Sequence, residues 1–255
     1  STGRMSTTST GCRHRYAMPT SWQSSLRGPG GDDLTEERYA RQVLHWGEEN
    51  QQRIAAAAVL VAGVGGLGAT VSQLLTRAGI GRLYLVDDGI VDWPDLNRQL
   101  LYGEGDLGRG KLQLAGERLR AINSNTEISL IDGRIDEHFV MPAGLNAVAD
   151  CLDNYPGRFL LDELTPKGLF LVHGGLEGDH GQVMTLQSGR SQPMAAIFAG
   201  VCQPEGCIPV TPDNVVIVAG LMVNELFATL FGRPKLLNRC LVVSLADFHM
   251  AFLDV

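Results

Sequence analysis

The chain has 255 residues, of which 44% are hydrophobic and 19% are charged. That balance excludes a chain that is disordered throughout, and the length suits one α/β domain or two small ones. The 21 Lys and Arg against 28 Asp and Glu give a net charge of −7 without a basic block, which disfavours a general nucleic-acid binder. Small molecules and proteins are the expected partners.

Cysteine usage and the first residues bear on the cellular compartment. The five cysteines, at positions 12, 151, 202, 207 and 240, form no Cys-x-x-Cys pair. An odd number without such pairs favours a reducing cytoplasm over a disulfide framework. Residues 1–32 are rich in Ser, Thr, Gly and Arg and have no apolar run, which predicts a flexible leader and no secretory signal.

Helical and extended patterns alternate along the rest of the chain. Two helices, 33–46 and 48–57, precede an apolar strand at 59–62, and a helix at 67–78 then leads to a strand at 82–87. These last three elements predict a β-α-β unit with a right-handed crossover. The later elements are a helix at 111–122, strands at 127–131 and 147–151, a helix at 158–164, and strands at 169–172, 182–186 and 240–245.

The longest apolar stretch, residues 215–231, has Asn224 and Glu225 near its middle. About 17 residues is the short limit for crossing a bilayer, so we expect a buried core helix. The whole pattern predicts an α/β fold with a doubly wound, mostly parallel Rossmann-like sheet and added antiparallel strands near the C-terminus. Residues 33–255 are expected to form a single domain.

A glycine-rich loop lies between the strand at 59–62 and the helix at 67–78. Its sequence is Gly63-Val64-Gly65-Gly66-Leu67-Gly68. Glycines at these positions let backbone N–H groups approach a phosphate, and the helix N-terminus favours an anion. Asp87 ends the next strand, 19 residues after Gly68, where a carboxylate can accept hydrogen bonds from a ribose. Together these features predict a nucleotide site.

Three charged residues beyond Asp87 indicate which nucleotide it binds. Arg98, Lys111 and Asp153 each follow a predicted strand, at the sheet edge where open α/β folds bind ligands. Two cations and a carboxylate around a glycine loop suit a triphosphate with magnesium better than a dinucleotide. A dehydrogenase is therefore the weaker interpretation.

This ordered set resembles the ThiF/MoeB/HesA family, the bacterial relatives of ubiquitin-activating enzymes, from about Glu37 to the C-terminus. The motifs that carry the likeness are Arg38-Tyr39-Ala40-Arg41-Gln42, the glycine loop, Asp87, Asn97-Arg98-Gln99, Gly110-Lys111 and Asp150-Cys151-Leu152-Asp153-Asn154. The resemblance implies ATP- and magnesium-dependent attachment of AMP to the C-terminal glycine carboxylate of a ubiquitin-like sulfur-carrier protein, with release of pyrophosphate.

The resemblance also implies roles for individual residues. Asp153 would coordinate magnesium, and Arg41 would reach the neighbouring site of a homodimer. Together with Arg98 and Lys111, these two residues are the candidate catalytic set. The candidate nucleotide-binding residues are Gly63, Gly65, Gly66, Gly68, Asp87, Asn97, Arg98, Gln99, Lys111, Asp153 and Asn154.

The sequence departs from the family in two respects. Many members carry two Cys-x-x-Cys pairs for zinc, and because this sequence has none, zinc is not expected. Pro94-Asp95 stands where the family often has Ser-Asn, so Asp95 adds a carboxylate that could weaken ATP binding or become a magnesium ligand.

Two roles stay open at this level. Cys207, or less plausibly Cys202, could form a covalent intermediate, although an inert loop thiol is favoured because Glu205 supplies no cationic surrounding. His173 could be catalytic, but a histidine that ends a strand more often bonds locally. Two alternative functions remain: carboxylate activation on a tRNA-modification substrate, disfavoured by the acidic balance, and non-catalytic binding of a ubiquitin-like partner.

Overall fold

The computed structural model describes residues 33–202, 206 and 208–255. The predicted leader at 1–32 and Cys207 lie outside the described residues. The chain divides into two units, residues 1–38 and 39–255. Of the first unit, the described residues 33–38 belong to the first turns of helix α1 (Asp33–Trp46). All the features below belong to the second unit.

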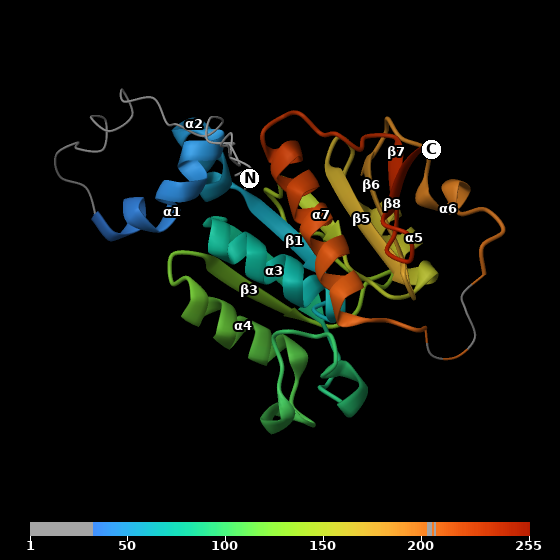
Figure 1. Ribbon diagram of the computed structural model, residues 1–255, viewed down its shortest axis with the longest axis horizontal. Helices are drawn as coiled ribbons and strands as arrows, with labels where there is room; N and C mark the ends of the chain where they lie inside the picture. Colours follow the sequence, from blue (N-terminus) through green and yellow to red (C-terminus); the bar gives the residue numbers. More distant parts are fainter. Residues whose placement is uncertain (1–32, 203–205, 207) are drawn as a thin grey trace, which may run out of the picture. The chain divides into compact units, whose positions relative to one another are not determined.

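Eight strands of that unit form a mixed sheet in the order β3-β2-β1-β4-β5-β6-β7-β8 (Figure 1). The strands from β3 to β5 pair in parallel, and those from β5 to β8 pair antiparallel. This confirms the predicted fold class. The bounds are β1 Ala58–Ala62, β2 Arg82–Asp87, β3 Glu127–Asp132, β4 Ala147–Asp150, β5 Phe170–Glu177, β6 His180–Gln187, β7 Arg239–Ser244 and β8 His249–Asp254.

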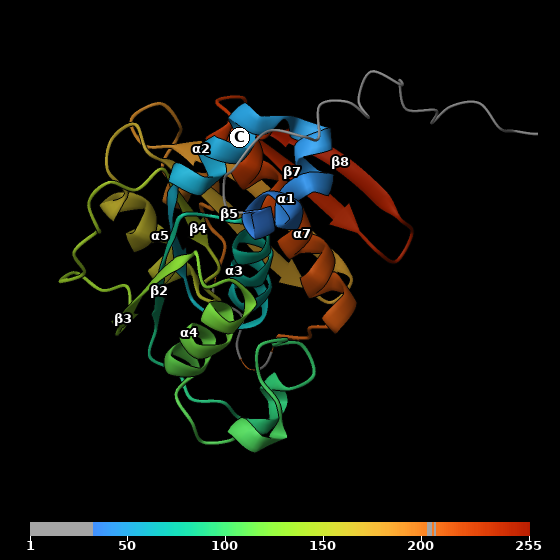
Figure 2. The same ribbon diagram turned by 90° about the vertical axis from the view of Figure 1, so that its left-hand side faces the viewer.

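Helices cover both faces of the sheet, and alternate residues of a central strand such as β1 are buried in the core on one face or the other. One core lies under α3, α4 and α7 and takes Val59 and Val61 of β1, whereas the core on the other face, under α5 and α6, takes Leu60 and Ala62. Figures 1 and 2 show α5 on the side of the sheet opposite α3 and α7. The remaining helical bounds are α2 Glu48–Ala56, α3 Gly66–Ala78, α4 Lys111–Ile122, α5 Tyr155–Leu164, α6 Met194–Ile197 and α7 Pro212–Leu230.

Helix α7 passes by length and composition as a membrane span, but 56% of its apolar window is buried within the fold. It packs on β5 and β6 and against α3, as the core-helix interpretation predicts. Gly174 of β5 makes the contact close, because a Cβ there would lie 2.2 Å from the sulfur of Met222. The sequence predicted that this strand ends at residue 172. In the structure, β5 continues through Gly174 and Gly175 as far as Glu177.

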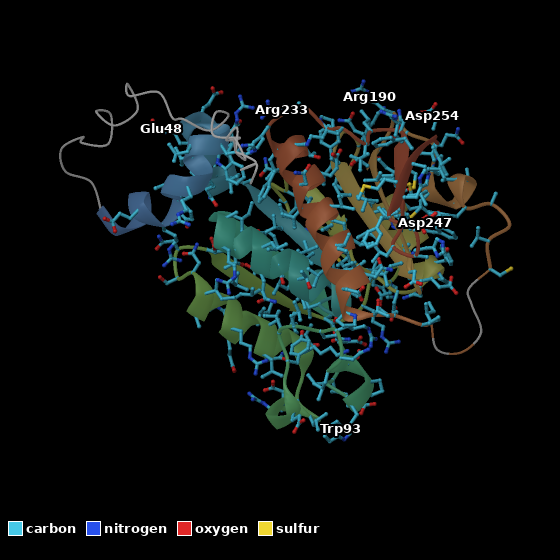
Figure 3. All side chains as sticks on the ribbon, viewed as in Figure 1. Glu48, Trp93, Arg190, Arg233, Asp247 and Asp254 are labelled. Carbon is cyan, nitrogen blue, oxygen red and sulfur yellow. The ribbon has the colours of Figure 1, made fainter. Side chains whose placement is uncertain are left out.

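A long connection joins β2 to α4 and contains two short 3₁₀ turns, η2 (Trp93–Asp95) and η3 (Glu104–Asp106). Its two ends are tied together by backbone hydrogen bonds, from Val91 N–H to the Arg109 carbonyl and from Lys111 N–H to the Gly89 carbonyl, each 2.9 Å. We call residues 89–111 the β2–α4 loop, and its last residue, Lys111, is also the first residue of α4. Trp93, which is 62% exposed, lies at its tip (Figure 3).

Candidate active site

The glycine loop is a tight turn between β1 and α3. Gly63 has φ +86°, and a Cβ on Gly68 would lie 1.8 Å from the Gly63 carbonyl oxygen, so both positions require glycine. Helix α3 begins at Gly66, with no side chain capping its first turn. The orphan N–H groups of that turn are therefore available for an anion.

Asp87 ends β2 beside the glycine loop. Its carboxylate accepts hydrogen bonds from the Val64 N–H at 2.8 Å and the Gly89 N–H at 2.7 Å. These two bonds hold the carboxylate at the C-terminal edge of the sheet, between the glycine loop and the start of the β2–α4 loop. The position is the one expected for a ribose-binding acid.

The β2–α4 loop brings three predicted residues to the glycine loop. Arg98 and Gln99 lie over it, since a Cβ on Gly66 would be 3.7 Å from Arg98 Cγ and one on Gly65 would be 3.6 Å from Gln99 Nε2. Lys111 reaches the same edge, because its Cδ would be 3.4 Å from a Cβ on Gly89. Two cations and a helix N-terminus thus converge on one place that can bind a polyphosphate.

Asp95 lies between these cations. Its Oδ2 is 2.9 Å from Lys111 Nζ, and its Oδ1 accepts a 2.6 Å hydrogen bond from Gln99 Nε2 and is 3.9 Å from Arg98 Nη2. Asp95 also caps its own turn, where Oδ2 accepts from the Asp92 N–H at 3.1 Å. The sequence flagged this carboxylate as unusual but could not reveal that it pairs with Lys111.

Two buried side chains fix the β2–α4 loop on the sheet. The Tyr102 hydroxyl donates to the Val64 carbonyl at 2.8 Å, and burial raises the pKa of Tyr102 far above its ordinary range. Asp106 accepts from the Gly103 N–H at 2.8 Å and pairs with Arg118 of α4 at 2.5 Å. Neither residue was predicted from the sequence, because both act through the loop that they hold.

Asp153 and Asn154 follow β4, whose end lies beside β1 through the pairing of Asp150 with Ala62. Asp153 is exposed, and its Oδ1 is 3.3 Å from Asn154 Nδ2. The Asn154 side chain accepts from the Gly157 N–H at 2.8 Å and so starts α5 three residues earlier than the sequence predicted. Among the described residues, no three His, Cys, Asp or Glu side chains are grouped closely enough to hold a metal ion.

Arg158 is a cation that the sequence analysis missed. Its side chain is buried on the inner face of α5 and donates to the Leu152 carbonyl through Nε at 3.0 Å and Nη2 at 2.7 Å. Nη2 also lies 3.4 Å from the Gly174 carbonyl. The available signal was an arginine directly before the apolar residues Phe159, Leu160 and Leu161 of α5. It holds together the ends of β4 and β5 next to Asp153.

A buried polar chain starts at the end of β4. Asp150 Oδ2 is 2.7 Å from His173 Nδ1, and His173 Nε2 is 3.2 Å from Gln182 Nε2. Burial lowers the pKa of His173 below its ordinary value, although the hydrogen bond that the ring donates to Asp150 opposes the shift. A neutral ring that donates from Nδ1 to Asp150 and accepts from Gln182 at Nε2 satisfies all three groups.

Arg41, one of the residues singled out in the sequence, lies away from this centre. Arg41 is exposed on α1, and its neighbour Gln42 donates to the Ala78 carbonyl at the C-terminal end of α3. Because the 13 residues of α3 span about 20 Å, Arg41 is far from the glycine loop of its own chain. Asn97 stays with Arg98, because its Oδ1 accepts a hydrogen bond from Arg98 Nη1 at 2.9 Å, while its Nδ2 donates to the Val210 carbonyl at 3.4 Å. Cys202 is exposed on the segment before α7.

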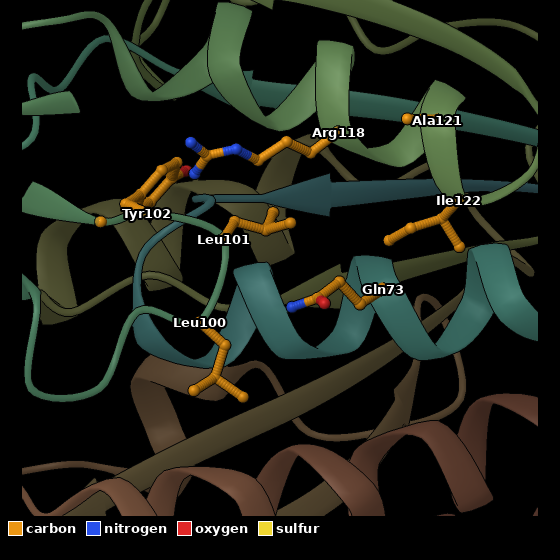
Figure 4. A pocket seen from close by; sticks show the side chains of 8 residues that line it. Gln73, Leu100, Leu101, Tyr102, Arg118, Ala121 and Ile122 are labelled. Atoms are coloured by element: carbon orange, nitrogen blue, oxygen red, sulfur yellow. The ribbon is translucent and has the colours of Figure 1, made fainter. Parts of the chain in front are cut away.

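A separate hollow of about 500 Å³ opens between α3, α4 and residues 100–103 (Figure 4). Its walls are mostly apolar and include Leu100, Leu101 and Ile122. The cation at its edge, Arg118, is paired with Asp106. The hollow therefore offers much less for an anion than the glycine loop.

The sequence of the chain is similar to those of known proteins. The sequence profile of the ThiF family matches residues 39–255. The chain is 32% identical over 214 residues to the sulfur carrier protein adenylyltransferase of Thermus thermophilus, covering 78% of this chain and 79% of that protein. It is 36% identical over 160 residues to the SAMP-activating enzyme E1 of Haloferax volcanii, covering 60% of this chain but only 59% of that relative.

A likeness to a solved structure agrees with the fold. The crystal structure of E. coli MccB superposes with a TM-score of 0.77 and 17% sequence identity, covering 88% of this chain and 71% of that one. At that identity the likeness concerns the fold alone.

Proposed function

Because the chain belongs to the ThiF family, we propose that it is an adenylyltransferase that uses ATP to activate the C-terminal carboxylate of a small ubiquitin-like sulfur carrier. The observation that carries the proposal is the convergence of Arg98, Lys111 and the glycine loop beside Asp87. The named activity of the Thermus relative supports the choice of a sulfur carrier as substrate. We place the reaction in the cytoplasm, because an odd number of cysteines without a Cys-x-x-Cys pair favours a reducing compartment.

The reaction needs little proton transfer. A C-terminal carboxylate is ionised at neutral pH and can attack the α-phosphorus of ATP directly. The bond between the α-phosphorus and the oxygen that bridges to the β-phosphate breaks, and pyrophosphate leaves with the negative charge on that oxygen. Arg98 and Lys111 would stabilise the charge on the phosphoryl oxygens, while Asp87 would fix the ribose and the glycine loop would bind phosphate through its N–H groups.

The residues also fit a magnesium ion carried by the nucleotide. Mg²⁺ is typically bound through one or two carboxylates plus substrate phosphates, and Asp153 offers such a carboxylate at the edge of the sheet. When bound, the ion neutralises the charge of the phosphates. Asn97 and Asn154 would lie beside the nucleotide, at the two ends of the site.

The second subunit of a homodimer would complete the site. Arg41 is exposed on α1, at the far end of α3 from the glycine loop. An arginine at that place serves its own site poorly and can serve the site of a second copy instead. We therefore include a homodimer, with Arg41 acting across the interface, in the proposed function.

ATP–pyrophosphate exchange with a Gly-Gly-ended carrier tests the proposal. We expect exchange with the intact carrier and none with a carrier that lacks its last two glycines. Arg98→Ala and Asp153→Ala should each lower the rate by roughly 10²–10³-fold, since the first removes a cation that stabilises the phosphoryl charge and the second removes the carboxylate that would hold magnesium beside it. Arg77→Ala, an exposed arginine at the other end of α3, is the matched control and should leave the rate unchanged.

Near-normal exchange in both variants would contradict the proposal. Carrier binding that ignores ATP, without AMP transfer, would favour a non-catalytic binder of a ubiquitin-like partner. The pairing of Asp95 with Lys111 is the observation that supports this second candidate. Activity on RNA alone would favour the tRNA-modifying alternative.

A further inference from the structure

The lysine proposed for phosphate binding already has an anionic partner within its own chain. Lys111 and Asp95 form an ion pair of 2.9 Å, and their side chains are only 14% and 13% exposed. An ion pair so poorly exposed is screened less by solvent than a surface pair. Lys111 therefore cannot take up a phosphate at its full charge unless Asp95 moves or is neutralised.

The same carboxylate also engages the other groups of the site. Oδ1 accepts from Gln99 Nε2 at 2.6 Å and lies 3.9 Å from Arg98 Nη2. One anion thus lies within 4 Å of both cations that approach the glycine loop. A phosphate bound there would be repelled by Asp95 as long as the carboxylate keeps its place.

Gln99 provides a second, independent observation. Its side chain is 4% exposed, and while Nε2 bonds to Asp95, the buried Oε1 has no hydrogen-bond partner. Leaving a buried acceptor unsatisfied is costly. Gln99 also lies next to Gly65 of the glycine loop. The contact with Asp95 thus leaves the Gln99 amide only half satisfied, so this arrangement of the side chains is not the most favourable one for Gln99.

We propose that Asp95 is an internal counter-ion of the nucleotide site, which holds Lys111 and Arg98 in the absence of ligand and is exchanged for the polyphosphate when ATP binds. This inference rests on the proposed ATP site and adds to it a residue that sets nucleotide affinity. A ligand gains from the exchange only if it carries polyphosphate to Lys111. AMP, which lacks the β- and γ-phosphates, gains nothing from the removal of Asp95.

Calorimetric titration of Asp95→Asn with ATP, AMP and inorganic tripolyphosphate tests the exchange. Asn keeps an oxygen for Gln99 and removes the charge that faces Lys111. We expect ATP and tripolyphosphate to bind about tenfold more tightly than to the wild type, and AMP to change by less than about twofold. Asp92→Asn is the matched control, because it removes a carboxylate from the same turn while the new amide oxygen can still accept the hydrogen bond that the Trp93 N–H donates to Asp92 Oδ1, and it should behave like the wild type.

Each other outcome has a defined meaning. Equal or weaker ATP binding by Asp95→Asn, or an equal gain for AMP, overturns the exchange. Weaker binding of ATP only when Mg²⁺ is present also overturns it, since Asp95 would then be a metal ligand. Tighter binding of tripolyphosphate by Asp95→Asn without any ATP binding would contradict the proposed function and support the exchange. No binding of either ligand to either protein would contradict both. Asp95→Ser replaces Asp95→Asn if the latter does not fold.

Discussion

Asp150 and His173 place two ionisable side chains entirely inside the fold. They face each other because Asp150 of β4 and His173 of β5 are register partners in the parallel sheet. Phe198 packs its ring against His173 at a centroid distance of 5.6 Å. Burial therefore lowers the pKa of His173 from its ordinary value of 6.5, despite the favourable bond to Asp150.

Stability should consequently depend on pH through His173. Above about pH 6.5 the ring is neutral in both states, but below it the unfolded chain binds a proton that the folded chain resists, so the free energy of unfolding falls as the pH falls. Urea unfolding at pH 7.5 and 5.5 should show this loss, and His173→Gln should reduce it. His138→Gln, at an exposed position, is the control. An undiminished loss in His173→Gln would exclude His173 as its source.

The sequence predicted many residues of the candidate site but few of the contacts between them. Asp87, Arg98 and Lys111 were predictable because strand ends of an open α/β sheet share one edge. The pairing of Asp95 with Lys111 was not, since it depends on how the β2–α4 loop closes at its base. Loop closure has no periodicity that a sequence pattern can show.

Glu225 connects α7 to the segment that leads into β7. Its Oε1 accepts from the Lys235 N–H at 2.9 Å, the Leu236 N–H at 2.8 Å and the Thr185 hydroxyl at 2.9 Å. The side chain is 1% exposed. One carboxylate thus accepts hydrogen bonds from three donors. This role explains why a glutamate is found in the otherwise apolar helix.

Glu225→Ala should lower the free energy of unfolding by about 3 kcal/mol, because it leaves these donors buried without an acceptor. Chemical denaturation with urea measures the change. Asn224→Ala alters the neighbouring exposed position, whose Oδ1 accepts from Lys235 Nζ at 2.8 Å, and should stay within about 0.5 kcal/mol of the wild type. Similar losses in both variants would argue against an anchoring role for Glu225.

Prediction of strands from the sequence succeeded where at least one face of the strand is buried and failed where neither face is buried. Strands β1 and β2 were found from their apolar runs, and the antiparallel pairing of β6 with β7 was also confirmed. Strand β8 was missed because all its residues except Ala251 are exposed, so its sequence shows no alternation between a buried and an open face. It is defined only by its backbone bonds to β7.

At the scale of the whole molecule, the proposed homodimer would divide each site between two copies. Within one chain, the glycine loop, Asp87, Arg98 and Lys111 lie at one end of α3, and Arg41 lies near the other. A homodimer in which each copy supplies Arg41 to the other would have two sites, each built from both chains.

Mixing two inactive variants tests this division. Arg41→Ala and Asp153→Ala should each be inactive alone. If Arg41 acts across the interface, each mixed dimer contains one intact site, and random assortment gives about a quarter of the wild-type exchange activity. If Arg41 acts within its own chain, every site carries one defect and no activity returns. Size-exclusion chromatography of the mixture provides the control for subunit exchange.

The tie at the base of the β2–α4 loop has an evolutionary consequence. Because the bonds of Val91 to Arg109 and of Lys111 to Gly89 fix the two ends, an exposed position between them, such as Trp93, can change without moving the strand and the helix on either side. Arg98, Gln99 and Lys111, which are proposed to meet the nucleotide, all belong to this one segment. Descendants of one ancestral fold could in this way diverge in nucleotide affinity while keeping the same architecture.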